Sequence, residues 1–222
     1  MTHVERTRLA VRDTSSGAGA GGGALVELEA RWDLPAEPQQ VVVLCHPHPK
    51  QRGTMNAPLM EALTTSLVPH GFAVLRFNFR GVGESTGTHD SGIGELDDVA
   101  AAVDAAAAAY PQLQVGVAGW SFGAATSLRW QARDDSHHAW VGVAPPVDSS
   151  RSMPLPTKAE LTAASRTLIL GDRDQFATVE TTQGYADSIG AELRVLKGSD
   201  HFFYFREDKV AGLIAEGLGE RA

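Results

Sequence analysis

The chain has 222 residues, of which 43% are hydrophobic and 21% charged, enough to bury a substantial core within one domain. Its 27 acidic residues outnumber its 19 basic residues and give a formal net charge of −8. This balance argues against nucleic acid or an anionic membrane as a partner, because both attract basic surfaces. The single cysteine, Cys45, cannot form an internal disulfide, which agrees with a reducing compartment.

The N-terminal residues MTHVERTRLA are polar, and no apolar stretch is long enough to span a bilayer. We therefore expect a cytoplasmic protein without membrane insertion. One domain is expected over residues 1–222, with an N-terminal hairpin over 1–38 and the core of the fold over 41–220.

The hairpin is predicted by two segments with alternating apolar residues, 4–11 and 24–32. A glycine-rich tract at 15–23 joins them and contains the pattern G-x-G-x-x-G. Polar residues precede this pattern and a strand, not a helix, follows it, so we reject a dinucleotide site. A mobile loop is the simpler interpretation.

Downstream of the hairpin, apolar runs alternate with helical patterns. Strands are predicted at 41–45, 72–79, 113–118, 138–147, 167–170 and 192–196, and helices at 57–69, 94–110, 124–133, 179–189 and 209–218. This alternation predicts an α/β fold, in which a mostly parallel sheet is covered by helices on both faces. Ligands of such sheets bind beyond the carboxyl ends of the strands.

The most informative pattern is VGVAGWSFG at residues 115–123. An apolar run leads into G-x-S-x-G, with Ser121 at its centre, and small residues follow. The pattern predicts a strand, a sharp turn and a helix, with the Ser121 hydroxyl held above the sheet by a strained backbone. The helix N-terminus then faces any negative charge that develops beside Ser121. A nucleophilic serine is predicted, and an ordinary tight turn is the alternative.

A serine hydroxyl becomes nucleophilic at neutral pH when an imidazole accepts its proton and a carboxylate orients that imidazole. In a fold of this kind the acid and the histidine follow the serine along the chain, each after a later strand. His137 and His138 precede every candidate acid, which leaves His201. The alternative for His201 is a half-buried histidine beside the aromatic run at 202–205.

Two candidate acids, Asp172 and Asp174, follow the same predicted strand. We favour Asp174, because its longer reach from the strand allows the carboxylate to turn toward His201. Asp172 is then a turn residue, and Asp200 is expected to be a loop residue.

Acyl transfer also needs two N–H groups to stabilise an oxyanion. One is expected from Phe122, which follows the serine, and the other from the loop at 46–50. The two prolines of this loop have no N–H, which leaves His46, His48 and Lys50. We favour His48, two residues beyond the strand.

His46 and His48 also suggest a metal pair. No cluster of acidic or cysteine ligands accompanies them. We therefore expect no metal and no other cofactor. Trp120 and Met55 are candidates for lining an apolar substrate site, with a role in the core as the alternative.

Together these motifs resemble the small α/β-hydrolases that lack a cap domain. The motifs that carry the resemblance are His46-Pro47-His48-Pro49, Gly53-Thr54-Met55, LRFNFRGVG at 75–83, Gly92-Ile93-Gly94-Glu95, the G-x-S-x-G at 119–123, Gly171-x-x-Asp174 and His201-Phe202-Phe203. The resemblance implies an oxyanion site at Phe122 and the loop 46–49, and a triad of Ser121, Asp174 and His201.

The resemblance also bears on the shape of the site. Larger relatives carry a lid in the segment that corresponds to 148–165, and this segment is too short for one. Thr157 and Glu160 form a capping box for one short helix there. The resemblance implies an open, shallow site without a lid, and it assigns Arg80 mainly to structure.

The combined prediction is a serine hydrolase that cleaves a carboxylic ester or thioester through an acyl-enzyme on Ser121. Its expected partner is a small-molecule substrate, and the oligomeric state, monomer or homodimer, stays open. A peptidase or a hydrolase of carbon–carbon bonds is an alternative, because the fold serves many reactions. A non-catalytic binding module is another alternative.

Overall fold

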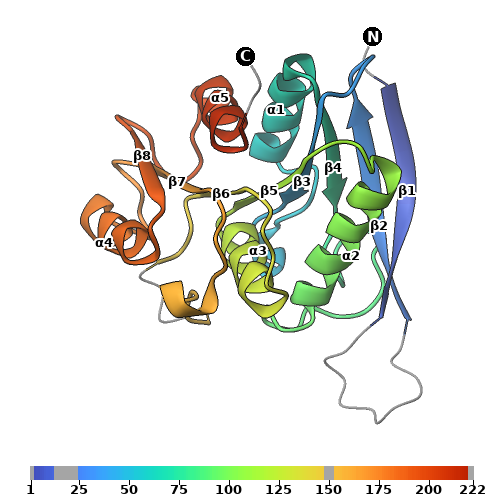
Figure 1. Cartoon of the computed structure of the whole chain (residues 1–222), viewed down its shortest axis with the longest axis horizontal. Helices are drawn as coiled ribbons and strands as arrows, with labels where there is room; N and C mark the ends of the chain where they lie inside the picture. Colours follow the sequence, from blue (N-terminus) through green and yellow to red (C-terminus); the bar gives the residue numbers. More distant parts are fainter. Residues whose placement is uncertain (1–2, 13–24, 148–152, 220–222) are drawn as a thin grey trace.

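The computed structural model describes residues 3–12, 25–147 and 153–219 (Figure 1). The strands are β1 His3–Arg12, β2 Leu25–Leu34, β3 Gln40–Cys45, β4 Phe72–Phe77, β5 Val115–Trp120, β6 Trp140–Val143, β7 Arg166–Gly171 and β8 Glu192–Leu196. They form one sheet in the order β1-β2-β4-β3-β5-β6-β7-β8. The pairs β1–β2 and β2–β4 are antiparallel, and every other neighbouring pair is parallel. The predicted sheet and hairpin are confirmed.

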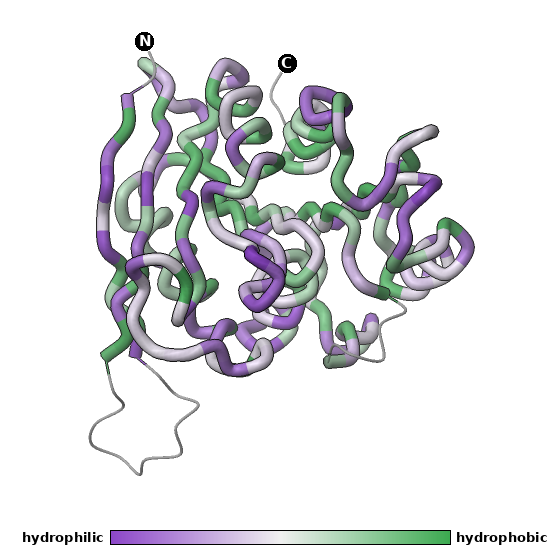
Figure 2. The backbone as a smooth tube through the Cα atoms, turned by 180° about the vertical axis from the view of Figure 1, so that it is seen from behind, coloured by the Kyte–Doolittle hydropathy of each residue, from purple (hydrophilic) through white to green (hydrophobic). Residues whose placement is uncertain are grey.

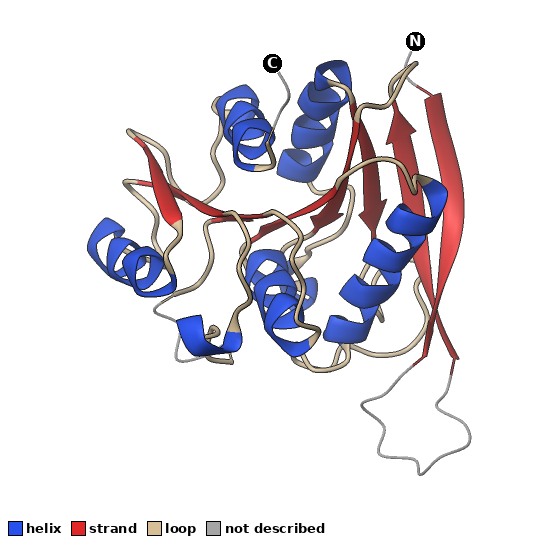
Figure 3. Ribbon diagram, in the orientation of Figure 1, coloured by secondary structure: helices blue, strands red, loops and turns tan. Residues whose placement is uncertain are grey.

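Helices cover both faces of the sheet (Figure 3). The helices are α1 Pro58–Leu67, α2 Glu95–Ala109, α3 Phe122–Arg133, α4 Val179–Ile189 and α5 Glu207–Gly217, with short 3-10 helices η1 Pro49–Gln51, η2 Val68–His70 and η3 Lys158–Glu160. Side chains of α2, α3 and α4 share one apolar core, and those of α1 and α5 share another on the opposite face. The central strands β3 to β7 are buried at every residue, as apolar runs in a two-sided sheet predict.

The hairpin strands differ from the central strands because only one of their faces is covered. In β2, alternate side chains from Val26 to Trp32 are buried, since successive residues of a strand point to opposite faces. In β1, which lies at the edge of the sheet, only Leu9 and Val11 are buried. Figure 2 shows these two strands as largely hydrophilic beside the hydrophobic centre of the sheet. The glycine-rich tract predicted at 15–23 lies outside the described residues.

One predicted strand end is wrong, at the start of the connection from β6 to β7. The strand predicted at 138–147 ends at Val143, because Pro145 and Pro146 have no N–H for the sheet ladder. The described part of the connection contains η3 and no lid domain. The carboxylate of Glu160 accepts hydrogen bonds there from the N–H and hydroxyl of Thr157, at 2.9 and 2.7 Å.

None of the described helices has the length and apolar character needed to cross a membrane.

Candidate active site

Ser121 alone forms the turn between β5 and α3. Its backbone has φ 54° and ψ −114°, a conformation that costs a non-glycine residue about 1 to 3 kcal/mol. The Ser121 N–H donates to the carbonyl of Val143 at 2.8 Å, and the Ser121 carbonyl accepts from the N–H of Ala125 at 3.0 Å. The strand reaches Trp120 and the helix starts at Phe122, so the turn is tighter than the predicted bounds of 118 and 124.

Close backbone packing explains the two glycines of the motif. A Cβ on Gly119 would lie 2.4 Å from the carbonyl carbon of Gly123. A Cβ on Gly123 would lie 2.2 Å from the carbonyl oxygen of Cys45, at the end of β3. Any side chain at either position would therefore push α3 away from the sheet and displace Ser121.

The structure brings Asp174 and His201 together. The distance from Asp174 Oδ2 to His201 Nδ1 is 2.8 Å. The buried carboxylate of Asp174 is oriented by its other oxygen, Oδ1, which accepts from the N–H groups of Phe176 at 2.7 Å and Ala177 at 3.1 Å. Asp172 instead accepts from the N–H of Gly198 at 2.6 Å. Of the two candidate acids, Asp174 is the one that contacts His201.

The hydrogen bond to Asp174 also determines which nitrogen of the His201 ring is available to act as a base. A carboxylate only accepts hydrogen bonds, so His201 Nδ1 is the donor, and in the neutral ring Nε2 is left with a lone pair. The indole Nε1 of Trp120 donates to the carbonyl of His201 at 3.1 Å. Because Trp120 directly precedes Ser121, this bond holds the His201 loop against the turn that carries the serine.

The His46 side chain is a structural link between two strand ends. It is fully buried, its Nδ1 lies 2.6 Å from the carbonyl of Pro47, and its Nε2 accepts from the N–H of Phe79 at 3.0 Å. These bonds require a neutral ring with the proton on Nδ1. Burial lowers the pKa of His46 to about 4.

The buried His46 is expected to make the folded protein less stable in acid. The pKa of His46 falls from 6.5 in the unfolded chain to about 4 in the fold, so protons bind more strongly to the unfolded chain. The stabilisation from neutral His46 is present above pH 6.5 and is lost as the pH falls to about 4, by about 3 kcal/mol. Urea unfolding of wild type and His46→Asn at several pH values measures this.

The His46→Asn variant should be less stable at neutral pH but should lose less stability between pH 6.5 and 4. His137→Asn, at an exposed position, is the control and should follow the wild-type slope. Parallel losses in wild type and His46→Asn would contradict the assignment.

The side chain of His48 lies beside that of Phe122, the other residue of the predicted oxyanion site. Their ring centroids are 5.1 Å apart. The Nδ1 of His48 accepts from the N–H of Lys50 at 3.2 Å, so Lys50 is already engaged and is a poorer donor candidate. Burial lowers the pKa of His48, and the neighbouring charges of His89 and Lys50 lower it further, which favours a neutral ring.

Comparison with known proteins identifies the family. A family model described as serine aminopeptidase, S33, matches residues 36–172, more than half of the chain. The chain belongs to this family of α/β-hydrolases. The matched segment includes Ser121 but ends before Asp174 and His201, so the roles of those two residues depend on their geometry.

Relatives of this α/β-hydrolase span most of its length. A solved structure from Coxiella burnetii, described as an α/β serine hydrolase homologue, is 31% identical with a TM-score of 0.76, covering 87% of this chain and 92% of its own. One from Xanthomonas campestris, described as an α/β serine hydrolase without lid, is 27% identical with a TM-score of 0.75, covering 96% and 94%. An uncharacterized protein of Rickettsia prowazekii is 30% identical over 199 residues, covering 86% and 84%.

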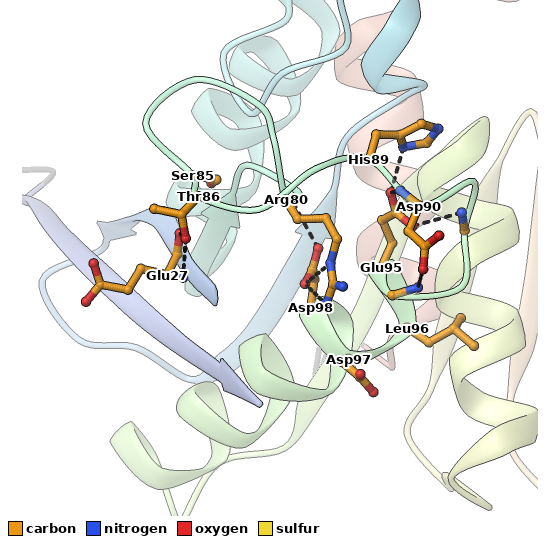
Figure 4. Close-up of polar contacts among 12 residues, drawn as sticks. Glu27, Arg80, Ser85, Thr86, His89, Asp90, Glu95, Leu96, Asp97 and Asp98 are labelled. Carbon is orange, nitrogen blue, oxygen red and sulfur yellow. Dashed lines mark hydrogen bonds and ion pairs between the residues drawn. The ribbon is translucent and has the colours of Figure 1, made fainter. Parts of the chain in front are cut away.

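The sequence did not predict a second buried carboxylate–histidine contact in this α/β-hydrolase (Figure 4). Glu95, at the start of α2, is fully buried. Its two oxygens accept from the N–H groups of Asp90 and Gly92 at 2.9 and 2.8 Å, and Oε1 lies 2.6 Å from His89 Nδ1. The ring of His89 is 5.6 Å from that of Phe122. The loop after β4 therefore borders the predicted oxyanion site.

The signal for this contact was the glycine pattern before Glu95, which the sequence interpretation treated as the start of a helix and as one motif of the family resemblance, without assigning a role to Glu95. A carboxylate that gathers N–H groups of its own preceding loop needs glycines where the chain bends, and Gly92 has φ 91°. The sequence pattern gave no sign that the Glu95 side chain is buried, because an acidic residue in the first turn of a helix is also favoured when it is exposed.

Arg80 and Asp98 anchor the other end of the same loop (Figure 4). Asp98 accepts from the backbone N–H of Arg80 at 2.9 Å and from its Nε and Nη2 at 3.0 and 2.9 Å. Both side chains are buried. This contact joins the residues after β4 to α2 and agrees with the mainly structural role implied for Arg80.

Trp120 and Met55, the candidates for a substrate pocket, lie in different surroundings. Trp120 is buried in the core shared by α1 and α5 and contacts His201. Met55 is buried, and its backbone bonds to the side chains of Asn78 and Arg76. Their contact with substrate stays a prediction. Among the described residues, no group of three or more His, Cys, Asp or Glu side chains is placed to hold a metal ion.

Proposed function

We propose that this α/β-hydrolase cleaves a carboxylic ester or thioester through an acyl-enzyme on Ser121. The observation that carries the proposal is the 2.8 Å contact between Asp174 and His201, in a loop held by Trp120 against the strained turn of Ser121. A carboxylate, an imidazole with a free Nε2 and a half-buried serine on a strained turn are the three parts that acyl transfer requires.

In the proposed reaction, Ser121 Oγ attacks the substrate carbonyl while His201 Nε2 takes the hydroxyl proton. The N–H groups of His48 and Phe122 hold the oxyanion. The intermediate collapses as His201 returns the proton to the leaving alcohol or thiol, which departs and leaves an ester on Ser121. Water then attacks this ester with His201 again as base, and the carboxylic acid and free Ser121 are formed.

The family description makes an aminopeptidase the main competing proposal. An aminopeptidase needs an acceptor for the free ammonium group of its substrate. The carboxylates described in the β7 and β8 loops are engaged with neighbouring groups: Asp172 with Gly198, Asp174 with His201, and Asp200 with the N–H groups of Phe202 and Phe203. In the proposed function these carboxylates hold their own loops, and the substrate carries no positive charge next to the scissile bond.

Covalent labelling with a fluorophosphonate probe tests the proposal. The wild type should be labelled at Ser121, because the probe requires a serine activated by its histidine. His201→Ala should lose labelling, and the control His137→Ala should keep it. A wild-type protein that is folded and unlabelled would favour a non-catalytic binding module instead.

A substrate panel separates the possible acyl bonds. We expect p-nitrophenyl esters of graded chain length, or acyl-CoA thioesters, to be hydrolysed faster than aminoacyl p-nitroanilides. Faster hydrolysis of the anilides would support the aminopeptidase and contradict this proposal.

A further inference from the structure

Four large aromatic side chains close to His201 in the sequence or the fold are exposed to solvent. The exposed fractions are 52% for Phe176, 40% for Phe202, 61% for Tyr204 and 92% for Phe205. Single exposed apolar residues are common on protein surfaces, whereas a cluster of them indicates a binding site.

Three of these rings form one connected group around His201. The rings of Phe176 and Phe202 meet the His201 ring edge to face, with centroids 4.6 and 5.6 Å away. Tyr204 stacks on Phe202 at 5.8 Å, and the buried ring of Trp120 meets that of Phe202 edge to face at 6.0 Å. We call Phe176, Phe202 and Tyr204 the aromatic rim.

The loop that carries Phe202, Tyr204 and Phe205 contains two residues in a strained backbone conformation. Phe203 is fully buried with φ 54°, and Phe205 has φ 61°, a region that bulky residues rarely adopt. The carboxylate of Asp200 accepts from the N–H groups of Phe202 and Phe203 at 2.9 and 3.2 Å and stabilises the turn. Strained backbone of this kind is typical of functional sites.

The chemistry of acyl transfer decides which part of a substrate meets the rim. His201 must protonate the leaving group, so the leaving oxygen or sulfur lies within hydrogen-bond reach of His201 Nε2. The carbonyl oxygen points instead toward the N–H groups of Phe122 and His48. Side chains packed on the His201 ring therefore lie nearest the leaving group.

We propose that the aromatic rim of Phe176, Phe202 and Tyr204 is a leaving-group subsite, selective for esters and thioesters whose alcohol or thiol carries an aromatic ring. This inference rests on the proposed function. A ring that enters the rim can make edge-to-face or stacked pairs like those already present among its members. It also removes exposed apolar surface of the rim from water.

The test uses ethyl, cyclohexylmethyl and benzyl esters of one carboxylic acid, so that all three form the same acyl-enzyme. For wild type we expect kcat/KM for the benzyl ester to exceed that for the ethyl ester by about 10-fold or more, from the additional buried apolar area. The kcat/KM for the benzyl ester should exceed the kcat/KM for the cyclohexylmethyl ester by about 2- to 10-fold, because only the benzyl ring makes aromatic pairs.

Phe176→Leu and Phe202→Leu should lower the benzyl-to-cyclohexylmethyl ratio by about 2- to 10-fold. Any effect of these variants through the position of the His201 ring acts on all three esters alike and cancels in this ratio. Phe205→Leu is the matched control: it lies in the same turn, and among the described residues no aromatic ring pairs with it. The benzyl-to-cyclohexylmethyl ratio of kcat/KM in Phe205→Leu should equal the wild-type ratio.

Three results would overturn the subsite. They are equal kcat/KM values for the three esters, a loss of ratio in Phe205→Leu equal to that in the rim variants, and rim variants that lower kcat/KM for all three esters by the same factor. The last result would mean that the rings only position His201. A protein labelled at Ser121 by a fluorophosphonate but without the benzyl preference contradicts the subsite alone. A protein that is neither labelled nor active on any ester contradicts the proposed function, and the subsite with it.

Discussion

Replacement of Ser121 by alanine is expected to lower kcat/KM, for any ester that the wild type hydrolyses, by about 10⁴-fold or more. The hydroxyl is the only atom group removed, and the strained turn is held by backbone bonds to Val143 and Ala125. The variant should therefore fold. His201→Ala should show a loss of similar size, because the serine then has no base. Steady-state kinetics with a circular dichroism check of folding measure both effects.

Ser121, Asp174 and His201 should also act as one catalytic unit. The double variant Ser121→Ala/His201→Ala is expected to be about as slow as either single variant, since each change alone already abolishes the acyl-enzyme route. Asp174→Asn should lower kcat by about 10³- to 10⁴-fold, because it no longer fixes the proton on His201 Nδ1. The matched control Asp172→Asn should have a much smaller effect. Multiplicative losses in the double variant, or full activity of Ser121→Ala, would contradict the proposed mechanism.

Removal of the Asp98 carboxylate is expected to cost about 3 to 5 kcal/mol of unfolding free energy. Asp98→Ala leaves the buried guanidinium of Arg80 without its carboxylate, and three hydrogen bonds from Arg80 to Asp98 are lost. The cost is large because water cannot replace the missing charge in the interior. Urea unfolding at neutral pH measures the difference from wild type.

Asp104→Ala is the control, since Asp104 lies on the same helix, α2, but is exposed; its effect should stay within about 0.5 kcal/mol. A double variant with apolar residues, Arg80→Met/Asp98→Leu, should recover much of the lost stability, because neither buried charge then remains. A loss in Asp98→Ala no larger than in Asp104→Ala would contradict the structural role of this contact.

The elements of this fold could largely be predicted from local patterns. Buried runs such as Val41 to Cys45 indicated central strands, and helical spacing indicated α4 with the bounds later found in the structure. The G-x-S-x-G pattern indicated the turn at Ser121, because close packing of strand and helix admits only glycine at positions 119 and 123. These features follow from backbone sterics and periodicity, which act over a few residues.

By itself, therefore, the sequence determined the α/β alternation, the position of Ser121 and, through chain order, the choice of His201. Only the tertiary structure decided that Asp174 and not Asp172 contacts His201, that Lys50 is engaged by His48, and that Glu95 is buried beside His89. The aromatic rim is also visible only there. The contacts of His201 with Asp174 and Phe176 join loops that follow different strands, so their distances depend on how the strands are ordered in the sheet. The contacts of His48 with Lys50 and of His89 with Glu95 join residues close in the sequence, and their geometry depends on a loop conformation that residue types alone do not specify.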